Sequence, residues 1–89
     1  MQALDIRVYG KVQGVFFRAN TQKRARQWGL TGRVRNESDG SVHIQVQGKS
    51  EALEAFVAWC RIGDAPAVVS RCEVEEIAPF SEEDFLIVR

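Results

Sequence analysis

The sequence has no apolar run long enough to cross a membrane, and its first residues, Met1 to Asp5, lack the layout of a signal peptide. These absences predict a cytoplasmic protein with no membrane partner. Only two cysteines and one histidine occur, which is few for a zinc site. Cys60 and Cys72 both stand in apolar segments. We therefore expect buried, reduced thiols, with a disulfide or a metal site as the less favoured alternatives.

An excess of charge of either sign is also absent, because 12 basic side chains balance 12 acidic ones. A dedicated nucleic-acid-binding protein normally carries an excess of lysine and arginine, so we expect no nucleic-acid partner. A small anion needs only local positive charge, and its binding stays open. The chain has 89 residues, of which 45% are hydrophobic and 27% charged, as is typical of one globular domain over residues 1–89. We expect this domain to be a monomer.

Hydrophobic periodicity predicts a strand and then a helix in the first third of the chain. Apolar and polar residues alternate from about residue 3 to residue 12, which is typical of a half-buried strand. The next apolar-face positions recur at helical spacing and therefore share one side of a helix: Phe17, Thr21, Ala25 and Trp28. Gly29 follows at the usual position of a C-terminal cap.

The rest of the chain predicts further strands and a second helix. The segment from Glu37 to Gly40 ends in the Asp-Gly pair of a tight hairpin turn, and alternating residues flank it on both sides. Ser50 is the expected cap of the second helix. The apolar face of that helix is Leu53, Phe56, Val57 and Cys60. The remaining strands are expected at about residues 30–36, 42–46, 69–77 and 85–88.

This order of elements predicts an α+β fold of the ferredoxin-like type. Both helices have one apolar stripe, and the best-patterned strands have one apolar face. The simplest packing places both helices on one face of an antiparallel sheet of four to five strands, an α/β sandwich in the order βαββαβ. The first two strands then both run opposite to the third, so their ends meet at one edge of the sheet.

The segment from Gly10 to Arg18 joins the first strand to the first helix and has the features of an anion site. A helix N-terminus presents unpaired N–H groups and a partial positive charge. Gly14 permits a backbone conformation in which successive N–H groups converge, and Arg18 adds a planar fork of donors. A plain strand-to-helix turn with an exposed arginine explains the segment equally well. The segment is neither a Walker loop nor a dinucleotide-binding motif.

Two motifs in the correct order carry a resemblance to a known family. The first is Gly10-x-Val12-Gln13-Gly14-Val15-x-Phe17-Arg18, and the second is Gly32-x-Val34-Arg35-Asn36-x-x-x-Gly40-x-Val42 followed by Gly48. Together they resemble the two signatures of the acylphosphatase family, and the similarity covers nearly the whole chain. Arg33 departs from the pattern, because the family usually has an aromatic residue there. This change affects one face of the second strand and leaves the packing near the site open.

The resemblance implies a hydrolase that cleaves the carboxyl-phosphate bond of a small acyl phosphate without metal or cofactor. Arg18 resembles the arginine that binds phosphate in the family, and Asn36 resembles the asparagine that positions the attacking water. The backbone amides of the cradle that would hold inorganic phosphate or a similar anion match Gln13, Gly14, Val15, Phe16, Phe17 and Arg18. Arg18 and Asn36 are therefore the expected catalytic residues.

Other polar clusters give weaker predictions. Asp39, Ser41 and His43 share a face of the hairpin, but residues two apart on a strand are about 6.5 Å apart, which is too far for the hydrogen bonds of a catalytic triad. We expect His43 to be a solvated strand residue. The acidic residues near the C-terminus show no metal-ligand spacing and are expected to be a solvated face.

Two non-enzymatic functions remain as alternatives. Ferredoxin-like sheets also serve as RNA-binding and regulatory domains, but the open face offers Tyr9 beside His43 and Gln45, which is a poor platform for stacking bases. The second alternative is a phosphate-binding domain that has lost turnover. The presence of both Arg18 and Asn36 disfavours it.

Overall fold

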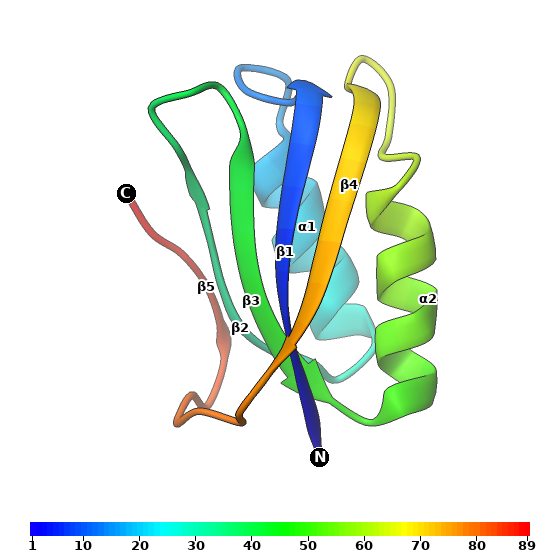
Figure 1. Ribbon diagram of the computed structural model, residues 1–89, viewed down its shortest axis with the longest axis vertical. Helices are drawn as coiled ribbons and strands as arrows, with labels where there is room; N and C mark the ends of the chain where they lie inside the picture. The colour runs from blue at the N-terminus through cyan, green and yellow to red at the C-terminus, as the bar shows by residue number, and fades with distance from the viewer.

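Seven elements follow one another in the order expected from the sequence (Figure 1). The computed structural model describes residues 1–89. The elements are β1 (Gln2–Lys11), α1 (Phe17–Gln27), β2 (Thr31–Asn36), β3 (Val42–Gly48), α2 (Ser50–Cys60), β4 (Val68–Ile77) and β5 (Phe85–Ile87). The expectation that Ser50 caps α2 is wrong, because the cap is Lys49 and no side chain bonds the free amides there.

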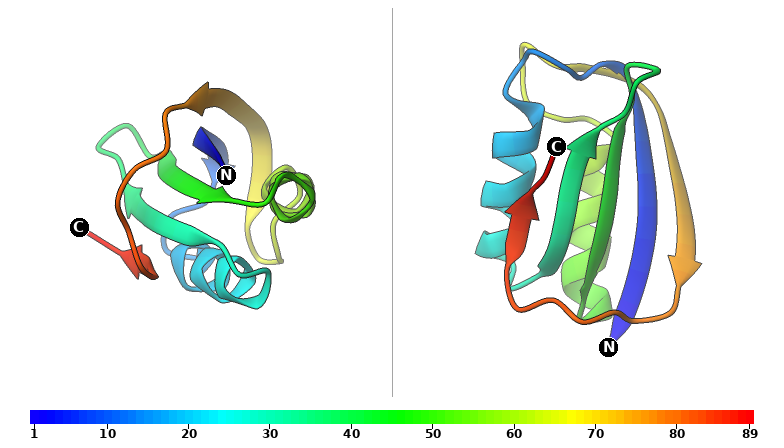
Figure 2. Two further views of the ribbon diagram at one scale, coloured as in Figure 1. Left: turned by 90° about the horizontal axis from the view of Figure 1, so that it is seen from below. Right: turned by 90° about the vertical axis from the view of Figure 1, so that its left-hand side faces the viewer.

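The strands form one sheet in the order β4-β1-β3-β2-β5. Neighbours among β1 to β4 pair antiparallel, with Ile6 opposite Ile44 at the centre. The ferredoxin-like α+β fold is confirmed, but the sheet is mixed because β5 pairs parallel to β2. Figures 1 and 2 show the reason. Strand β4 stops at the end of the sheet at which β2 starts, and the segment after β4 crosses that end, so β5 runs beside β2 in the same direction.

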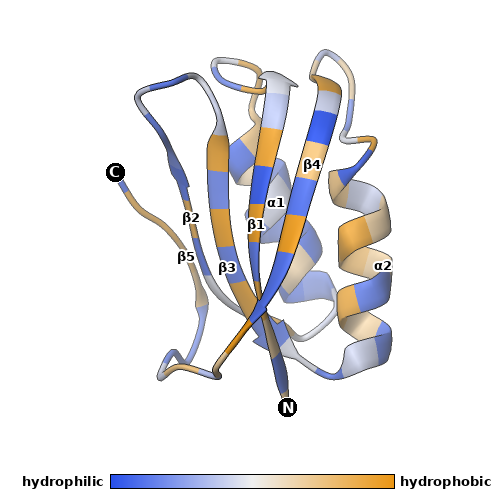
Figure 3. Ribbon diagram, in the orientation of Figure 1, coloured by the Kyte–Doolittle hydropathy of each residue, from blue (hydrophilic) through white to orange (hydrophobic).

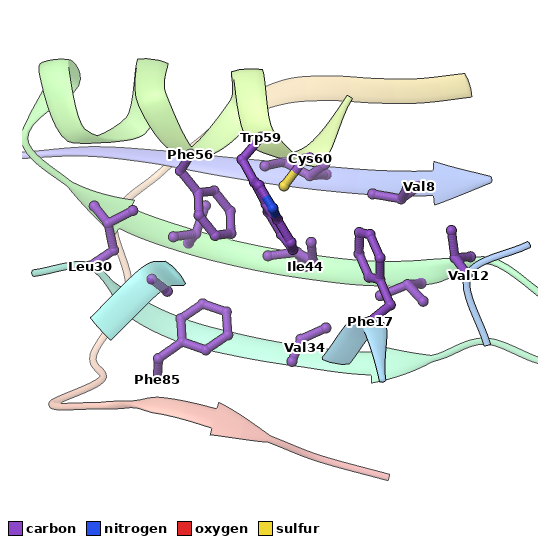
Figure 4. Packing of buried hydrophobic residues seen from close by; sticks show 14 of the residues in the cluster. Val8, Val12, Phe17, Leu30, Val34, Ile44, Phe56, Trp59, Cys60 and Phe85 are labelled. Carbon is purple, nitrogen blue, oxygen red and sulfur yellow. The ribbon is translucent and has the colours of Figure 1, made fainter. Parts of the chain in front are cut away.

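Both helices cover the same face of the sheet, as expected, and the core lies between them and the strands (Figure 2). Helix α1 packs on β2 and β5, and α2 packs on β3. The rings of Phe17 and Trp59 stack with centroids 5.2 Å apart, so the two helices meet over the sheet (Figure 4). Neither helix has the length and apolar character that crossing a membrane requires.

Alternation along the strands separates this core from the opposite face. Figure 3 shows hydrophobic and hydrophilic residues taking turns along β1 and β3. Ile6, Ile44 and Val34 are fully buried under the helices. Asp5 and His43 on the other face remain partly accessible. The period of two predicted for these strands is therefore the pattern that places the core.

The topology brings two loops to one end of the sheet. Strands β1 and β2 both run antiparallel to β3 and therefore run in the same direction as each other. The loop after β1 and the hairpin after β2 consequently lie at the same end, together with the start of α1 (Figure 1). The first motif and the second motif meet here.

Candidate active site

The loop between β1 and α1 has an alternating backbone conformation. Gly14 has φ 73° and Phe16 has φ 62°, so both are left-handed. A Cβ at Gly14 would meet nothing within 4 Å, which means that the backbone angle and not space requires glycine there. Left-handed residues between residues of ordinary handedness turn successive N–H groups toward one side and form an anion-binding nest.

The amides of this loop are unused by the protein. None of the backbone N–H groups from Gln13 to Arg18 donates a hydrogen bond to another protein group. The first amide of α1 to be paired is that of Asn20, which donates to the carbonyl oxygen of Phe16 at 3.0 Å. No acidic residue occupies the first turn of the helix. The row of donors and the positive end of the helix dipole are both free for an external anion.

Arg18 lies in the first turn of α1, half-buried beside this row of amides. Its Nη1 makes one long hydrogen bond, 3.5 Å, to the carbonyl oxygen of Val88 after β5. Arg18 takes part in none of the ion pairs of the structure, whereas Arg24 and Arg26 of the same helix pair with carboxylates. The charge of Arg18 is therefore not neutralised by the protein and can bind a phosphoryl group through several donors.

Asn36 is the last residue of β2, at the end of the sheet that carries the loop. Its side-chain oxygen Oδ1 is buried and has no hydrogen-bond partner within the protein. Buried polar atoms in folded proteins almost always have a partner, so such an exception calls for an explanation. A water molecule held by this oxygen would satisfy it. The expected role of Asn36 in orienting a water stays a prediction.

The side chain of Gln13 connects the two motifs. Its Nε2 donates to the carbonyl oxygen of Glu37 at 2.8 Å and to that of Ser41 at 2.9 Å. Both acceptors belong to the hairpin that follows Asn36. Sequence reasoning assigned only the backbone amide of Gln13 to the site and missed this role. No local signal reveals it, because the acceptors are main-chain atoms 24 and 28 residues away.

Comparison with known proteins now decides the family. A model of the acylphosphatase family matches residues 4–87. The chain belongs to the acylphosphatase family. It is 48% identical to an acylphosphatase of Mesorhizobium japonicum, a match that covers 98% of this chain and 94% of that one. It is 40% identical to an acylphosphatase of Methylococcus capsulatus, covering 100% and 98% of the two chains.

A solved structure supports the same assignment. The crystal structure of acylphosphatase from Bacillus subtilis superposes with a TM-score of 0.96 at 36% identity, and the match covers 100% of both chains. The fold and the enzyme class therefore agree with the resemblance carried by the two motifs. The chain is an enzyme of the acylphosphatase type.

Arg33, the departure from the acylphosphatase pattern, lies away from the loop. Its Nη2 pairs with Glu82 at 3.2 Å, and its side chain is about half exposed, with a relative accessibility of 47%. Its cross-strand neighbour is Gln45 in β3. The substitution therefore changes the polar outer face of the sheet and introduces an ion pair there.

The hairpin residues do not form a catalytic triad. Asp39 accepts hydrogen bonds from the hydroxyl of Ser41 at 2.5 Å and from its amide at 2.9 Å, a contact that the expected strand spacing had excluded. It forms because these residues lie in the turn and not in a regular strand. His43 contacts Asp5 at 2.6 Å and Glu37 at 3.3 Å instead. The side chain of His43 is 11% exposed, so the expectation of a solvated histidine is wrong.

Carboxylates near the hairpin are held in their charged form. The hydrogen bond from Arg35 lowers the pKa of Glu37 below its ordinary value. The hydroxyl and then the amide of Ser41 lower the pKa of Asp39. Both groups are ionised at neutral pH, and neither has the raised pKa that a general acid needs. Glu37 and Asp39 are therefore not suited to act as general acids.

Proposed function

We propose that the protein hydrolyses acyl phosphates to a carboxylate and inorganic phosphate, without a metal ion. In this proposal the amides of Gln13 to Arg18 and the guanidinium of Arg18 hold the phosphoryl group, and Asn36 orients the attacking water. The observation that carries it is the row of free amides beside an arginine without a carboxylate partner. Family membership supports the reaction class.

The leaving group explains why these residues suffice. Cleavage releases a carboxylate, whose conjugate acid has a pKa of about 4, close to that of an aspartic or glutamic side chain. Such a group departs without receiving a proton from the enzyme. The ionised state of Glu37 and Asp39 is therefore compatible with turnover.

The remaining task is to stabilise charge on the phosphoryl group as it is transferred. The transition state spreads negative charge over three equatorial oxygens, with the attacking and leaving oxygens roughly in line. Fixed N–H donors and the fork of Arg18 can bind these oxygens without rearranging during the reaction. The chain thus supplies the positive charge for which other phosphoryl-transfer enzymes use a metal ion, which is the basis for proposing metal independence.

The water is assigned to the unpaired oxygen of Asn36. This oxygen accepts a hydrogen bond from the water, which directs a lone pair of the water oxygen toward phosphorus. A new P–O bond forms as the P–O bond to the acyl group breaks, and the electron pair of the broken bond stays on the carboxylate. Since the amide of Asn36 is a poor base, the proton of the water passes to a phosphoryl oxygen, giving inorganic phosphate.

Release of phosphate from benzoyl phosphate, measured with and without EDTA, tests the proposal. Equal turnover under both conditions is expected. Activity that disappeared with EDTA would contradict the metal-free mechanism. Binding of inorganic phosphate without turnover would instead identify a phosphate-binding domain that has lost catalysis. The monomeric state and the cytoplasmic location remain predictions, which gel filtration and cell fractionation would check.

A further inference from the structure

Phe16 is an unusual residue in the anion loop. Its side chain is 78% exposed, although its neighbours Val15 and Phe17 are buried. It also has φ 62°, and a bulky non-glycine residue in the left-handed region is strained by roughly 1–2 kcal/mol. Neither burial nor backbone preference explains a phenylalanine here. Strained residues that persist in this way tend to cluster at functional sites.

Two further exposed apolar side chains occur where the chain passes from α2 to β4, at the same end of the molecule. Ile62 is 74% exposed and Val68 is 61% exposed. Between them, the position of a Cβ on Gly63 lies 3.2 Å from the ring of Phe17 in α1 and 3.3 Å from Val69 in β4. The start of α1 therefore lies close to the connection after α2, and the loop after β1 is at the same end of the molecule (Figure 1).

We propose that Phe16 binds the acyl part of the substrate and selects acyl phosphates whose acyl group is apolar, such as an aromatic one. This inference rests on the proposed function. A phosphoryl group held by the amides of residues 13–18 leaves the acyl group projecting from the loop. The large apolar surface that the loop itself presents is the ring of Phe16.

The location favours substrate over a protein partner. Phe16 lies inside the row of amides that the phosphoryl group occupies, so anything bound to the ring is within reach of the anion. An apolar acyl group gains free energy by covering the ring, whereas an acetyl group is too small to cover much of it. The contact therefore adds affinity only for the larger, apolar acyl phosphates.

Steady-state kinetics with two substrates test this assignment. Benzoyl phosphate and acetyl phosphate are compared for the unaltered protein, Phe16→Asn, Phe16→Leu and Val74→Ser. Asparagine tolerates the left-handed region, so Phe16→Asn removes the ring without adding backbone strain. Val74→Ser is the matched control, because Val74 is an exposed apolar residue in the middle of β4.

The ratio of kcat/KM for benzoyl phosphate to that for acetyl phosphate is expected to fall about five- to tenfold in Phe16→Asn, mainly through KM. The fall should be less than about twofold in Phe16→Leu, which keeps an apolar side chain. Val74→Ser should leave kcat/KM unchanged for both substrates. Inorganic phosphate, used as a competitive inhibitor of each variant, reports separately on the anion loop.

Three results would overturn the inference. In the first, Phe16→Asn lowers kcat/KM for both substrates and the affinity for inorganic phosphate by the same factor, which would mean that the residue only maintains the structure of the loop. In the second, the substrate ratio does not change. In the third, the unaltered protein self-associates and Phe16→Asn abolishes association, which would assign the surface to a second copy. Failure of the unaltered protein to hydrolyse either substrate would instead remove the proposed function itself.

Discussion

The Nε2 atom of Gln13 lies 2.9 Å from the carbonyl oxygen of Ser41 and joins the anion loop to the β2–β3 hairpin. The same atom donates to the carbonyl oxygen of Glu37 at the other side of the turn. The hairpin begins directly after Asn36. One side chain thus sets the position of the proposed phosphate-binding loop relative to the residue proposed to hold the water.

Removal of this link should affect turnover more than phosphate binding. Gln13→Ala loses two hydrogen bonds, so the free energy of unfolding should fall by about 1–2 kcal/mol. The kcat should also fall, although the variant stays folded, because in-line attack depends on the alignment of the water with the phosphoryl group. Urea unfolding and steady-state kinetics measure both effects. Gln22→Ala is the control, since Gln22 also donates to a main-chain oxygen, that of Phe85 at 2.8 Å. Equal loss of kcat in both variants would contradict the positioning role.

Arg18→Ala should abolish most of the affinity for inorganic phosphate and reduce turnover by about a hundredfold or more, because it removes donors aimed at developing charge. Arg18→Lys should recover only part of this loss, since an ammonium group lacks the planar fork. The inhibition constant of phosphate and kcat/KM are the measurements. Arg26→Ala removes a comparable charge that is already paired with Asp84 and should change neither. Unaltered phosphate inhibition in Arg18→Ala would exclude this residue from the anion site.

Asn36→Ala should separate catalysis from binding. Without the side-chain oxygen the water loses its orientation, and kcat should fall by about a hundredfold. The inhibition constant of inorganic phosphate should change by less than about threefold, because the amides and Arg18 remain in place. Competitive inhibition assays and single-turnover measurements give the two values. If the affinity for inorganic phosphate and kcat fell together, Asn36 would be a phosphate ligand and not the residue that positions the water.

Acid should destabilise the hairpin end of the molecule. The hydrogen bond from Arg35 lowers the pKa of Glu37, and Ser41 does the same for Asp39. The unfolded chain therefore binds more protons than the folded one as the pH falls below about 4.5, and stability decreases there. Chemical unfolding between pH 3 and pH 7, in the unaltered protein and in Glu37→Gln, would measure this. The effect is small because Asp39 is exposed and Glu37 is partly exposed to solvent, and Glu37→Gln should flatten the curve.

The two thiols should react slowly with alkylating reagents. Burial raises the pKa of Cys60 well above its ordinary value and also raises that of half-buried Cys72. Little thiolate is present at neutral pH, and the thiolate is the reactive form. Mass spectrometry after iodoacetamide treatment should find Cys72 modified first, and faster as the pH rises. Rapid modification of Cys60 in the native protein would contradict its enclosed position.

Local patterns predicted most of the fold. Alternation along β1 and β3 and helical spacing along α1 each reflect which side chains face the core, and this information is present within about ten residues of sequence. The hairpin at Gly40 and the helix end at Gly29 follow from backbone angles that glycine adopts readily, φ 93° and 69°. The two motifs located Arg18 and Asn36 because their order and spacing resemble a known family.

Contacts between distant segments could not be predicted in this way. The parallel pairing of β5 depends on where β4 ends, and its three residues are too few to show a period. The bonds from Gln13 depend on main-chain oxygens of the hairpin, which every residue has, so no residue type marks them. His43 was expected in solvent because its partners Asp5 and Glu37 come from two other segments.

The buried side-chain oxygen of Asn36, which has no partner within the protein, implies a trade-off between turnover and the free energy of unfolding. A buried oxygen that depends on a water for its hydrogen bond keeps that water immobilised, at a cost of up to about 2 kcal/mol. Variants selected only for remaining folded at high temperature would therefore tend to have an apolar residue in place of Asn36. Selection for turnover would retain it, and the protein would remain short of the greatest stability that its fold permits.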